Sequence, residues 1–201
     1  MTGDRLRQAA KALNQGVSQR VEGGQAAAFQ AILSAAARGD EDAFAALWRN
    51  LQPALLHYLH TIAPDVAEDI AAETWIEVIR GLQAFRGDEP TFRTWALTIA
   101  RKRVIDWRRR SDNLATEPQR TDMPDRQDAI ADAESSRAAL ALVATLPPAQ
   151  AEIVVLRVLG GLDVAEVAAV TGKRPSTVRL LSHRGLRRLA QMMESKSQAT
   201  E

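Results

Sequence analysis

The chain has 201 residues, of which 46% are hydrophobic and 4% aromatic, and its 26 Lys and Arg nearly balance 25 Asp and Glu, for a net charge of +1. A charge this small excludes bulk basicity as an argument for nucleic-acid binding, and the lack of cysteine excludes disulfides, thiolate chemistry and cysteine-bound zinc. Because no run of about 18 apolar residues occurs and the first residues are polar, we expect a soluble, cytoplasmic protein.

The first 24 residues are predicted to form a mobile or weakly helical extension. Their apolar residues have a loose helical spacing that Gly16, Gly23 and Gly24 weaken. An isolated helix of this length is barely stable in water. Residues 1–24 therefore receive no functional role.

A first helical domain is predicted over residues 25–110. Alanine and leucine dominate its apolar residues, which favours an all-α fold. Asp40 is a natural N-cap for a helix with one apolar stripe, and a further helix starts near Pro64. After a break rich in turn-forming residues over 81–90, a long helix is expected from Thr91 to about Arg110.

A flexible acidic linker over 111–133 is expected to join this domain to a second, smaller one over 134–193, followed by a tail over 194–201. The linker contains prolines and few bulky apolar residues, which favours a solvated segment. Two stretches rich in arginine and lysine, 101–110 and 173–188, stand on either side of it. The charge pattern therefore predicts two basic sites separated by an acidic link.

The end of the second domain has the pattern of a helix-turn-helix motif. Two short helices flank the turn 172–175, and Pro175 suits the first position of the second helix. Its first turns are expected to face DNA base edges in the major groove, whereas an amphipathic helix with a solvated basic face is the alternative. Residues expected to pack inward are Val178, Leu181, Leu186 and Leu189.

Aromatic and cationic residues alternate over 85–110. Melted DNA needs cations for its phosphates and flat rings for its unstacked bases, so this stretch is a candidate for single-strand binding. Helical spacing also requires some of Phe92, Trp95 and Trp107 to fill the core, and for any single ring core packing is the expected role.

The segments 65–75, 85–87 and 92–109 resemble region 2 of the extracytoplasmic-function (ECF) sigma factors, in the sigma-70 superfamily, and segments within 146–189 resemble their region 4. The resemblance implies an all-α protein of two small helical domains that gives core RNA polymerase its promoter specificity, aids promoter melting and is not an enzyme. It implies core RNA polymerase, duplex and melted promoter DNA, and an anti-sigma factor as partners, and no cofactor.

The resemblance also assigns residues. Polymerase binding falls to Glu68, Asp69, Glu73 and Trp75. The minus-ten element of the promoter falls to Phe85, Arg86, Asp88, Arg93, Trp95, Arg101, Arg103 and Trp107. The minus-thirty-five element falls to Arg174, Ser176, Thr177, Arg179, Leu180, His183, Arg184 and Arg187.

Other interpretations stay open at this point. The acids of 68–77 could form a plain solvated helix face. The chain could be a helix-turn-helix regulator that does not dock on polymerase, or a regulatory interaction protein with a sigma-like fold. A nucleic-acid-processing enzyme is disfavoured because paired acids at nuclease-like positions and a phosphate-binding glycine loop are missing. His57 and His60 lie three residues apart without an indicated third ligand, so no metal site is expected.

Overall fold

The computed structural model describes residues 24, 26–113 and 139–198, and every regular element among them is helical. The prediction of an all-α fold of two small helical groups is confirmed. Most of the predicted N-terminal extension and most of the predicted linker lie outside the described residues. No helix in the described part of the chain is long and apolar enough to cross a membrane.

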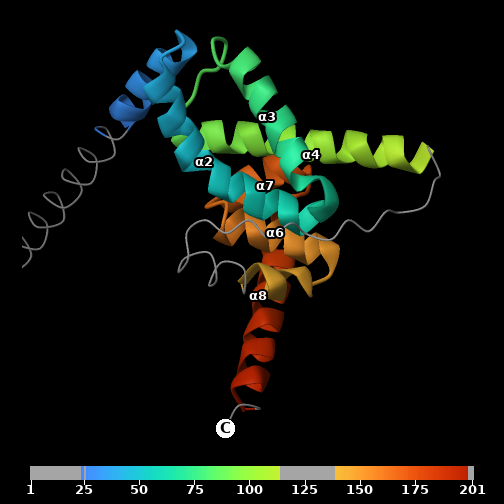
Figure 1. The fold of residues 1–201 in the computed structure, drawn as a ribbon. Helices are drawn as coiled ribbons and strands as arrows, with labels where there is room; N and C mark the ends of the chain where they lie inside the picture. The colour runs from blue at the N-terminus through green and yellow to red at the C-terminus, as the bar shows by residue number, and fades with distance from the viewer. Residues whose placement is uncertain (1–23, 25, 114–138, 199–201) are drawn as a thin grey trace, which may run out of the picture.

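The first group contains a helix at 26–37, α2 (Glu41–Ile62), the short 3-10 helix η1 (Pro64–Val66), α3 (Ala67–Gly81) and α4 (Glu89–Asn113). Figure 1 shows α4 crossing behind α2 and α3, and contacts join all three helices. Their shared core contains large side chains that are almost fully buried, among them Leu55, Leu59, Val78 and Leu97.

The N-terminus of α2 is fixed as the sequence predicts. The carboxylate of Asp40 accepts a hydrogen bond from the backbone N–H of Ala43 at 2.8 Å. This bond pairs one of the backbone donors that the first turn of a helix leaves free. Pro53 is accommodated inside α2, which continues to Ile62.

The cap supplies the first testable prediction. Replacing Asp40 with alanine is expected to lower the free energy of unfolding by about 1 kcal/mol, because the amide of Ala43 loses its acceptor. Asp40→Asn retains a side-chain oxygen and should stay close to wild type. Urea denaturation of both variants measures the difference, and equal losses would show that the charge, not the hydrogen bond, matters.

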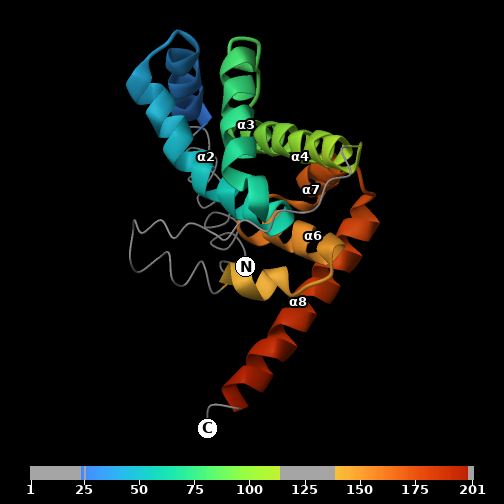
Figure 2. The same cartoon turned by 45° about the vertical axis from the view of Figure 1, so that its right-hand side comes forward.

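The second group contains a helix at 139–144, α6 (Pro148–Val158), α7 (Val164–Thr171) and α8 (Pro175–Gln198). Pro175 begins α8, as predicted. Both α6 and α7 contact α8, which continues well beyond them (Figure 2). The helix α8 therefore continues to Gln198, so it includes most of the stretch 194–201 that was predicted as a tail. Likewise, α4 extends three residues into the stretch predicted as linker.

The two groups also pack against each other, which the sequence did not predict. In Figures 1 and 2, α7 lies beside α4 and α6 beside α2, and both pairs are in contact. Buried residues of the two groups form one continuous apolar cluster. The two groups thus form a closed arrangement, in which the second group covers part of α2 and α4.

Candidate nucleic-acid and polymerase interfaces

The helix-turn-helix is built by strong local signals at both ends of α7. The carboxylate of Asp163 accepts from the backbone N–H groups of Ala165 and Glu166, and Glu166 accepts from the N–H of Asp163 at 2.6 Å. This reciprocal capping box defines where α7 begins. Gly172 ends it with a φ of 68°, a left-handed conformation that glycine adopts without strain.

The inward face of α8 differs in one position from the prediction. Val178 is fully buried, Leu181 and Leu189 are partly buried, but Leu186 is 45% exposed. Ser182 and Gly185 take the buried positions instead. A Cβ on Gly185 would lie 2.7 Å from Cγ2 of Val154, so α8 approaches α6 too closely for a larger side chain.

The outward face of α8 carries the predicted duplex-reading residues. Ser176, Arg179, His183 and Arg187 follow one another at helical spacing, on the side opposite Val178 and Gly185. All eight candidates are exposed: Arg174, Ser176, Thr177, Arg179, Leu180, His183, Arg184 and Arg187. The helix therefore presents a basic, solvent-facing surface at its N-terminal half, as a helix that enters a major groove requires.

The rings of Phe85, Phe92 and Trp95 contact one another beneath the loop between α3 and α4. Phe85 stacks on Trp95 with ring centroids 4.9 Å apart, and Phe92 lies 5.5 Å from Phe85 and 5.8 Å from Phe29. Phe92 is buried, whereas Phe85 and Trp95 are half-buried. The rings thus form a support for the loop, with partial exposure at Phe85 and Trp95.

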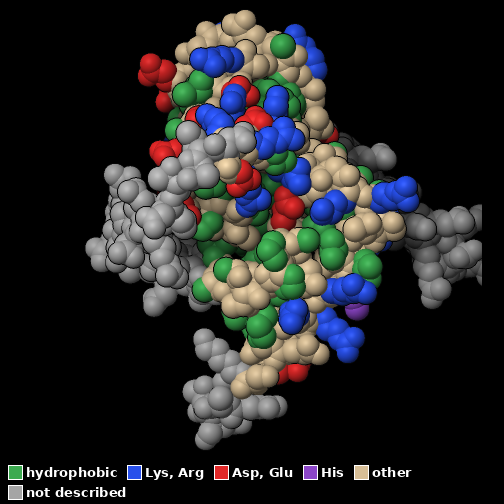
Figure 3. Space-filling model, turned by 90° about the vertical axis from the view of Figure 1, so that its right-hand side faces the viewer, with side chains coloured by type: hydrophobic (Ala, Val, Ile, Leu, Met, Phe, Trp, Pro, Cys, Tyr) green, Lys and Arg blue, Asp and Glu red, His purple; other side chains and the backbone are tan. Residues whose placement is uncertain are grey.

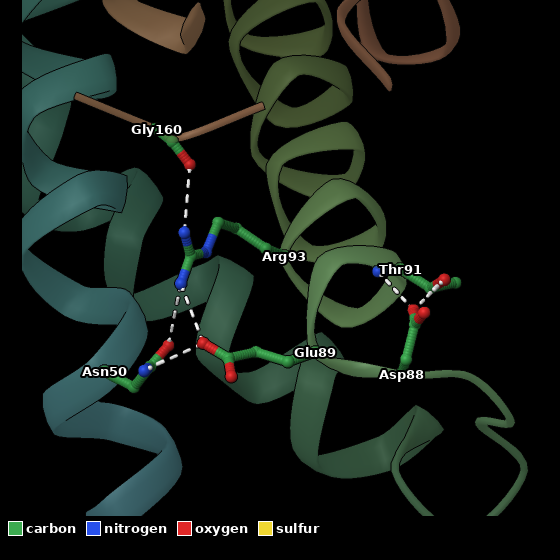
Figure 4. A network of polar contacts seen from close by, with 6 residues as sticks. All are labelled: Asn50, Asp88, Glu89, Thr91, Arg93 and Gly160. Atoms are coloured by element: carbon green, nitrogen blue, oxygen red, sulfur yellow. Dashed lines mark hydrogen bonds and ion pairs between the residues drawn. The ribbon is translucent and has the colours of Figure 1, made fainter. Parts of the chain in front are cut away.

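Polar contacts hold the loop itself. The guanidinium of Arg86 donates to the carbonyl of Gln83 at 2.8 Å and to that of Phe85 at 2.7 Å. Asp88 accepts from the hydroxyl of Thr91 and, at 3.0 Å, from its backbone N–H, and these two hydrogen bonds lower the pKa of Asp88 (Figure 4). In this arrangement Asp88 stabilises the start of α4. Gln30, in the helix at 26–37, donates to the carbonyl of Gly87.

The remaining minus-ten candidates lie along α4. Arg93 and Arg101 are half-buried and point toward the second helical group, whereas Arg103 bridges to α3 through Glu77 and, at 3.9 Å, Glu73. Trp107 is half-buried against the core. The arginines of α4 therefore contact different parts of the protein: Arg93 and Arg101 contact the second helical group, and Arg103 contacts α3.

Of the four residues of α3 predicted to bind polymerase, the three acids are exposed and the tryptophan is buried. Glu68, Asp69 and Glu73 are exposed. Trp75 is only 7% exposed, and its indole N–H donates to Gln52 at 2.6 Å, so it joins α3 to α2 and does not fit the role of an exposed contact. The apolar residues that α3 does expose are Ile76 and Ile79, which the sequence analysis did not select.

Charges are interspersed on the molecular surface. On the face drawn in Figure 3, Lys and Arg side chains lie in both the upper and the lower half, with Asp and Glu side chains between those of the upper half. Apolar side chains gather in the lower half. Basic character is thus local, in agreement with the small net charge of the whole sequence.

The two histidines of α2 carry no metal-like geometry. His60 lies 3.7 Å from a carboxylate oxygen of Glu68, and no group of three possible ligands occurs among the described residues. The pKa of His57 is lowered, because burial disfavours its charged form and His60 lies near.

The lowered pKa predicts a pH dependence of stability. Since the folded state disfavours protonated His57, the unfolded chain binds the proton more readily, and stability falls as the pH drops through the ordinary value of 6.5. Urea unfolding at about pH 7.5 and about pH 5.5 should show a smaller fall for His57→Gln than for wild type. His183→Gln, at an exposed position of α8, controls for the loss of a histidine.

These features define a helical protein that carries, in one chain, a helix-turn-helix with an exposed basic second helix and a helix with exposed acidic residues. Known families agree with this class. The sigma-70 region 2 model matches residues 42–113, and the sigma-70 region 4 model matches residues 136–189.

Relatives specify the family further. The ECF RNA polymerase sigma factor ShbA of Streptomyces griseus is 32% identical over 180 residues, covering 82% of this chain and 94% of ShbA. The ECF RNA polymerase sigma factor BldN of Streptomyces coelicolor is 31% identical over 81% of this chain, which spans 64% of BldN. The chain therefore belongs to the ECF sigma factors, which direct RNA polymerase to promoters.

A solved structure shares the fold. The sigma factor RpoE of Bartonella quintana, determined in complex with the anti-sigma factor NepR, matches with a TM-score of 0.55 at 18% identity. The match covers 75% of this chain and 96% of that one. It supports the helical architecture across both groups.

Proposed function

We propose that this sigma factor docks on core RNA polymerase through the exposed acids of α3, reads the minus-thirty-five element with α8, and holds the melted minus-ten element with the α3–α4 loop and α4. The observation that carries the proposal is the solvent-facing arginine series of α8, combined in one chain with an exposed acidic helix. Duplex and single-strand contacts would then act on one promoter from separate helical groups.

The proposed mechanism uses binding energy without chemistry. If α4 and its loop bind unpaired bases more tightly than paired ones, the melted state of the promoter is favoured by that difference in affinity. The protein then acts as a non-enzymatic factor in the cytoplasm, where core polymerase is found. An anti-sigma factor, such as the one RpoE binds in its complex, is the proposed regulatory partner.

Run-off transcription tests the proposal directly. Core polymerase is assayed on genomic DNA with and without this protein, and new transcripts with defined start sites are expected only in its presence. A parallel binding assay measures whether the protein associates with core polymerase. Intact association without any protein-dependent transcript would refute initiation and favour a regulatory interaction protein, whereas DNA binding without association would favour a stand-alone regulator.

Charge reversal tests the docking surface. Asp69→Lys on α3 is expected to weaken association with core polymerase, whereas Asp42→Lys, which changes another exposed acid at the start of α2, is the matched control. Equal loss from both variants would show that overall charge, rather than the α3 surface, determines association.

A further inference from the structure

Two of the α4 arginines assigned to melted DNA are bonded to the second helical group. Arg101 Nε lies 2.8 Å from Oε1 of Glu152 on α6, and both side chains are largely shielded, at 25% and 14% exposure. Hydrogen bonds between ionised groups at this distance are stronger than neutral ones. A carboxylate of the second group therefore occupies a guanidinium that a DNA phosphate would otherwise use.

Tyr58 of α2 completes this contact. Its hydroxyl donates to the same oxygen of Glu152 at 3.2 Å, and the side chain is almost fully buried. Burial and the neighbouring carboxylate raise the pKa of Tyr58, so it remains a protonated donor. Glu152 is thus held by donors from two different helices of the first group.

A second contact lies at the other end of the interface, around Arg93. Its guanidinium donates to the carbonyl of Gly160 at 3.3 Å, and also to Glu89 at 2.9 Å and Asn50 at 3.3 Å (Figure 4). Gly161 has a φ of 67°, and a Cβ there would lie 2.8 Å from Arg93 Nη1. Gly160 and Gly161, between α6 and α7, therefore allow the backbone turn to pack directly against the guanidinium of Arg93.

The interface is also imperfectly packed. A pocket of about 340 Å³, partly open to the surface, lies between the two groups, lined by Ile62, Arg101 and Arg108 on one side and by Leu146, Pro148 and Glu152 on the other. Nε of Arg93 is buried without a hydrogen-bond partner among the described residues. A buried unpaired donor disfavours the closed arrangement, which suits a contact that opens.

We infer that Glu152 is an internal competitor of DNA: by bonding Arg101 and Tyr58 it holds the second helical group over α4, and melted DNA binds only when this contact opens. The inference rests on the proposed role of α4 in single-strand binding. A carboxylate and a phosphate are both anions that accept from a guanidinium. Arg101 cannot serve both in the same geometry, so closure and single-strand binding exclude each other.

A distance measurement tests the opening without DNA or polymerase. The chain contains no cysteine, so Ala72→Cys on α3 and Ala190→Cys on α8, both exposed, give a single pair of spin labels in the full chain. Glu152→Ala is expected to broaden the label distances and shift them to longer values. Glu194→Ala, an exposed residue of α8, removes the same charge and should retain the wild-type distribution.

Affinity for a fluorescent single-stranded oligonucleotide of mixed sequence tests the competition. If the closed state is about ten times more populated than the open one, a variant that is always open should bind the oligonucleotide with about tenfold higher apparent affinity. Glu152→Ala should approach this gain, and Glu194→Ala should change affinity only by the small amount due to its charge. Glu152→Gln keeps the side-chain shape and should give a smaller gain, which preserves the test if the alanine variant folds poorly.

The outcomes are distinct. An unchanged label distance in both Glu152 variants would overturn the contact as a device that holds the closed state. Opening without a gain in oligonucleotide affinity over the Glu194 control would overturn the competition with DNA. Failure of the run-off assay would instead refute initiation, since the label distances are measured without polymerase or promoter.

Discussion

Arg179→Ala is expected to reduce affinity for the minus-thirty-five duplex by roughly 5- to 150-fold, the effect of losing one base contact worth about 1–3 kcal/mol. Arg179 lies near the start of α8 and is exposed, next to the buried Val178. The first turns of a recognition helix face base edges. The loss of affinity should therefore be large for the cognate duplex and small for unrelated duplexes.

Arg188→Ala is the matched control, because it removes the same charge from the same helix at a more C-terminal, exposed position. A cation that meets only phosphates contributes to all sequences alike and to the salt dependence of binding. Fluorescence anisotropy with promoter and scrambled duplexes at several salt concentrations separates the two effects. Equal loss of discrimination from both variants would contradict base reading by Arg179.

The elements that the sequence predicted well have local signals. Asp40 and Pro175 mark helix starts through chemistry that involves only their own first turns, and Gly172 marks a helix end through its backbone freedom. The exposure of the duplex-reading residues follows from the same local periodicity. The fold class and the helix-turn-helix could therefore be derived without knowledge of the packing.

Burial on α8 and α4 depends instead on how closely a neighbour approaches. Large apolar residues were expected to point inward, yet on α8 the buried positions include Ser182 and Gly185, because α6 approaches there. On α4, Ala96 and Ala100 are fully buried while Trp95 remains half-buried. Size and hydropathy do not encode such distances between helices.

Contacts between the two helical groups carry no local signal at all. Arg101 and Glu152 are 51 residues apart in sequence, and Arg93 and Gly160 are 67 apart. Each residue alone is typical of a solvated helix or turn. The sequence therefore predicted the cations of α4 as candidate DNA contacts but not their closed-state partners, which only the tertiary arrangement defines.

The aromatic cluster beneath the α3–α4 loop gives the largest expected effect on stability. Phe92 is 2% exposed and lies within 6 Å, centroid to centroid, of the rings of Phe29, Phe85 and Trp95. Phe92→Ala is expected to cost about 3–5 kcal/mol, since it removes a buried ring and leaves a cavity among three others. That loss is a large fraction of the 5–15 kcal/mol typical of a folded domain.

Urea denaturation measures this loss, with Phe92→Leu as the conservative variant, expected to cost roughly 1.5 kcal/mol, and Val158→Ala, at a 57% exposed position, expected to stay within about 0.5 kcal/mol. Because the cluster supports the loop, amide exchange at Arg86 and Gly87 should accelerate more in Phe92→Ala than exchange in α8. A stability loss with uniform acceleration along the chain would show that the rings stabilise the fold without positioning the loop.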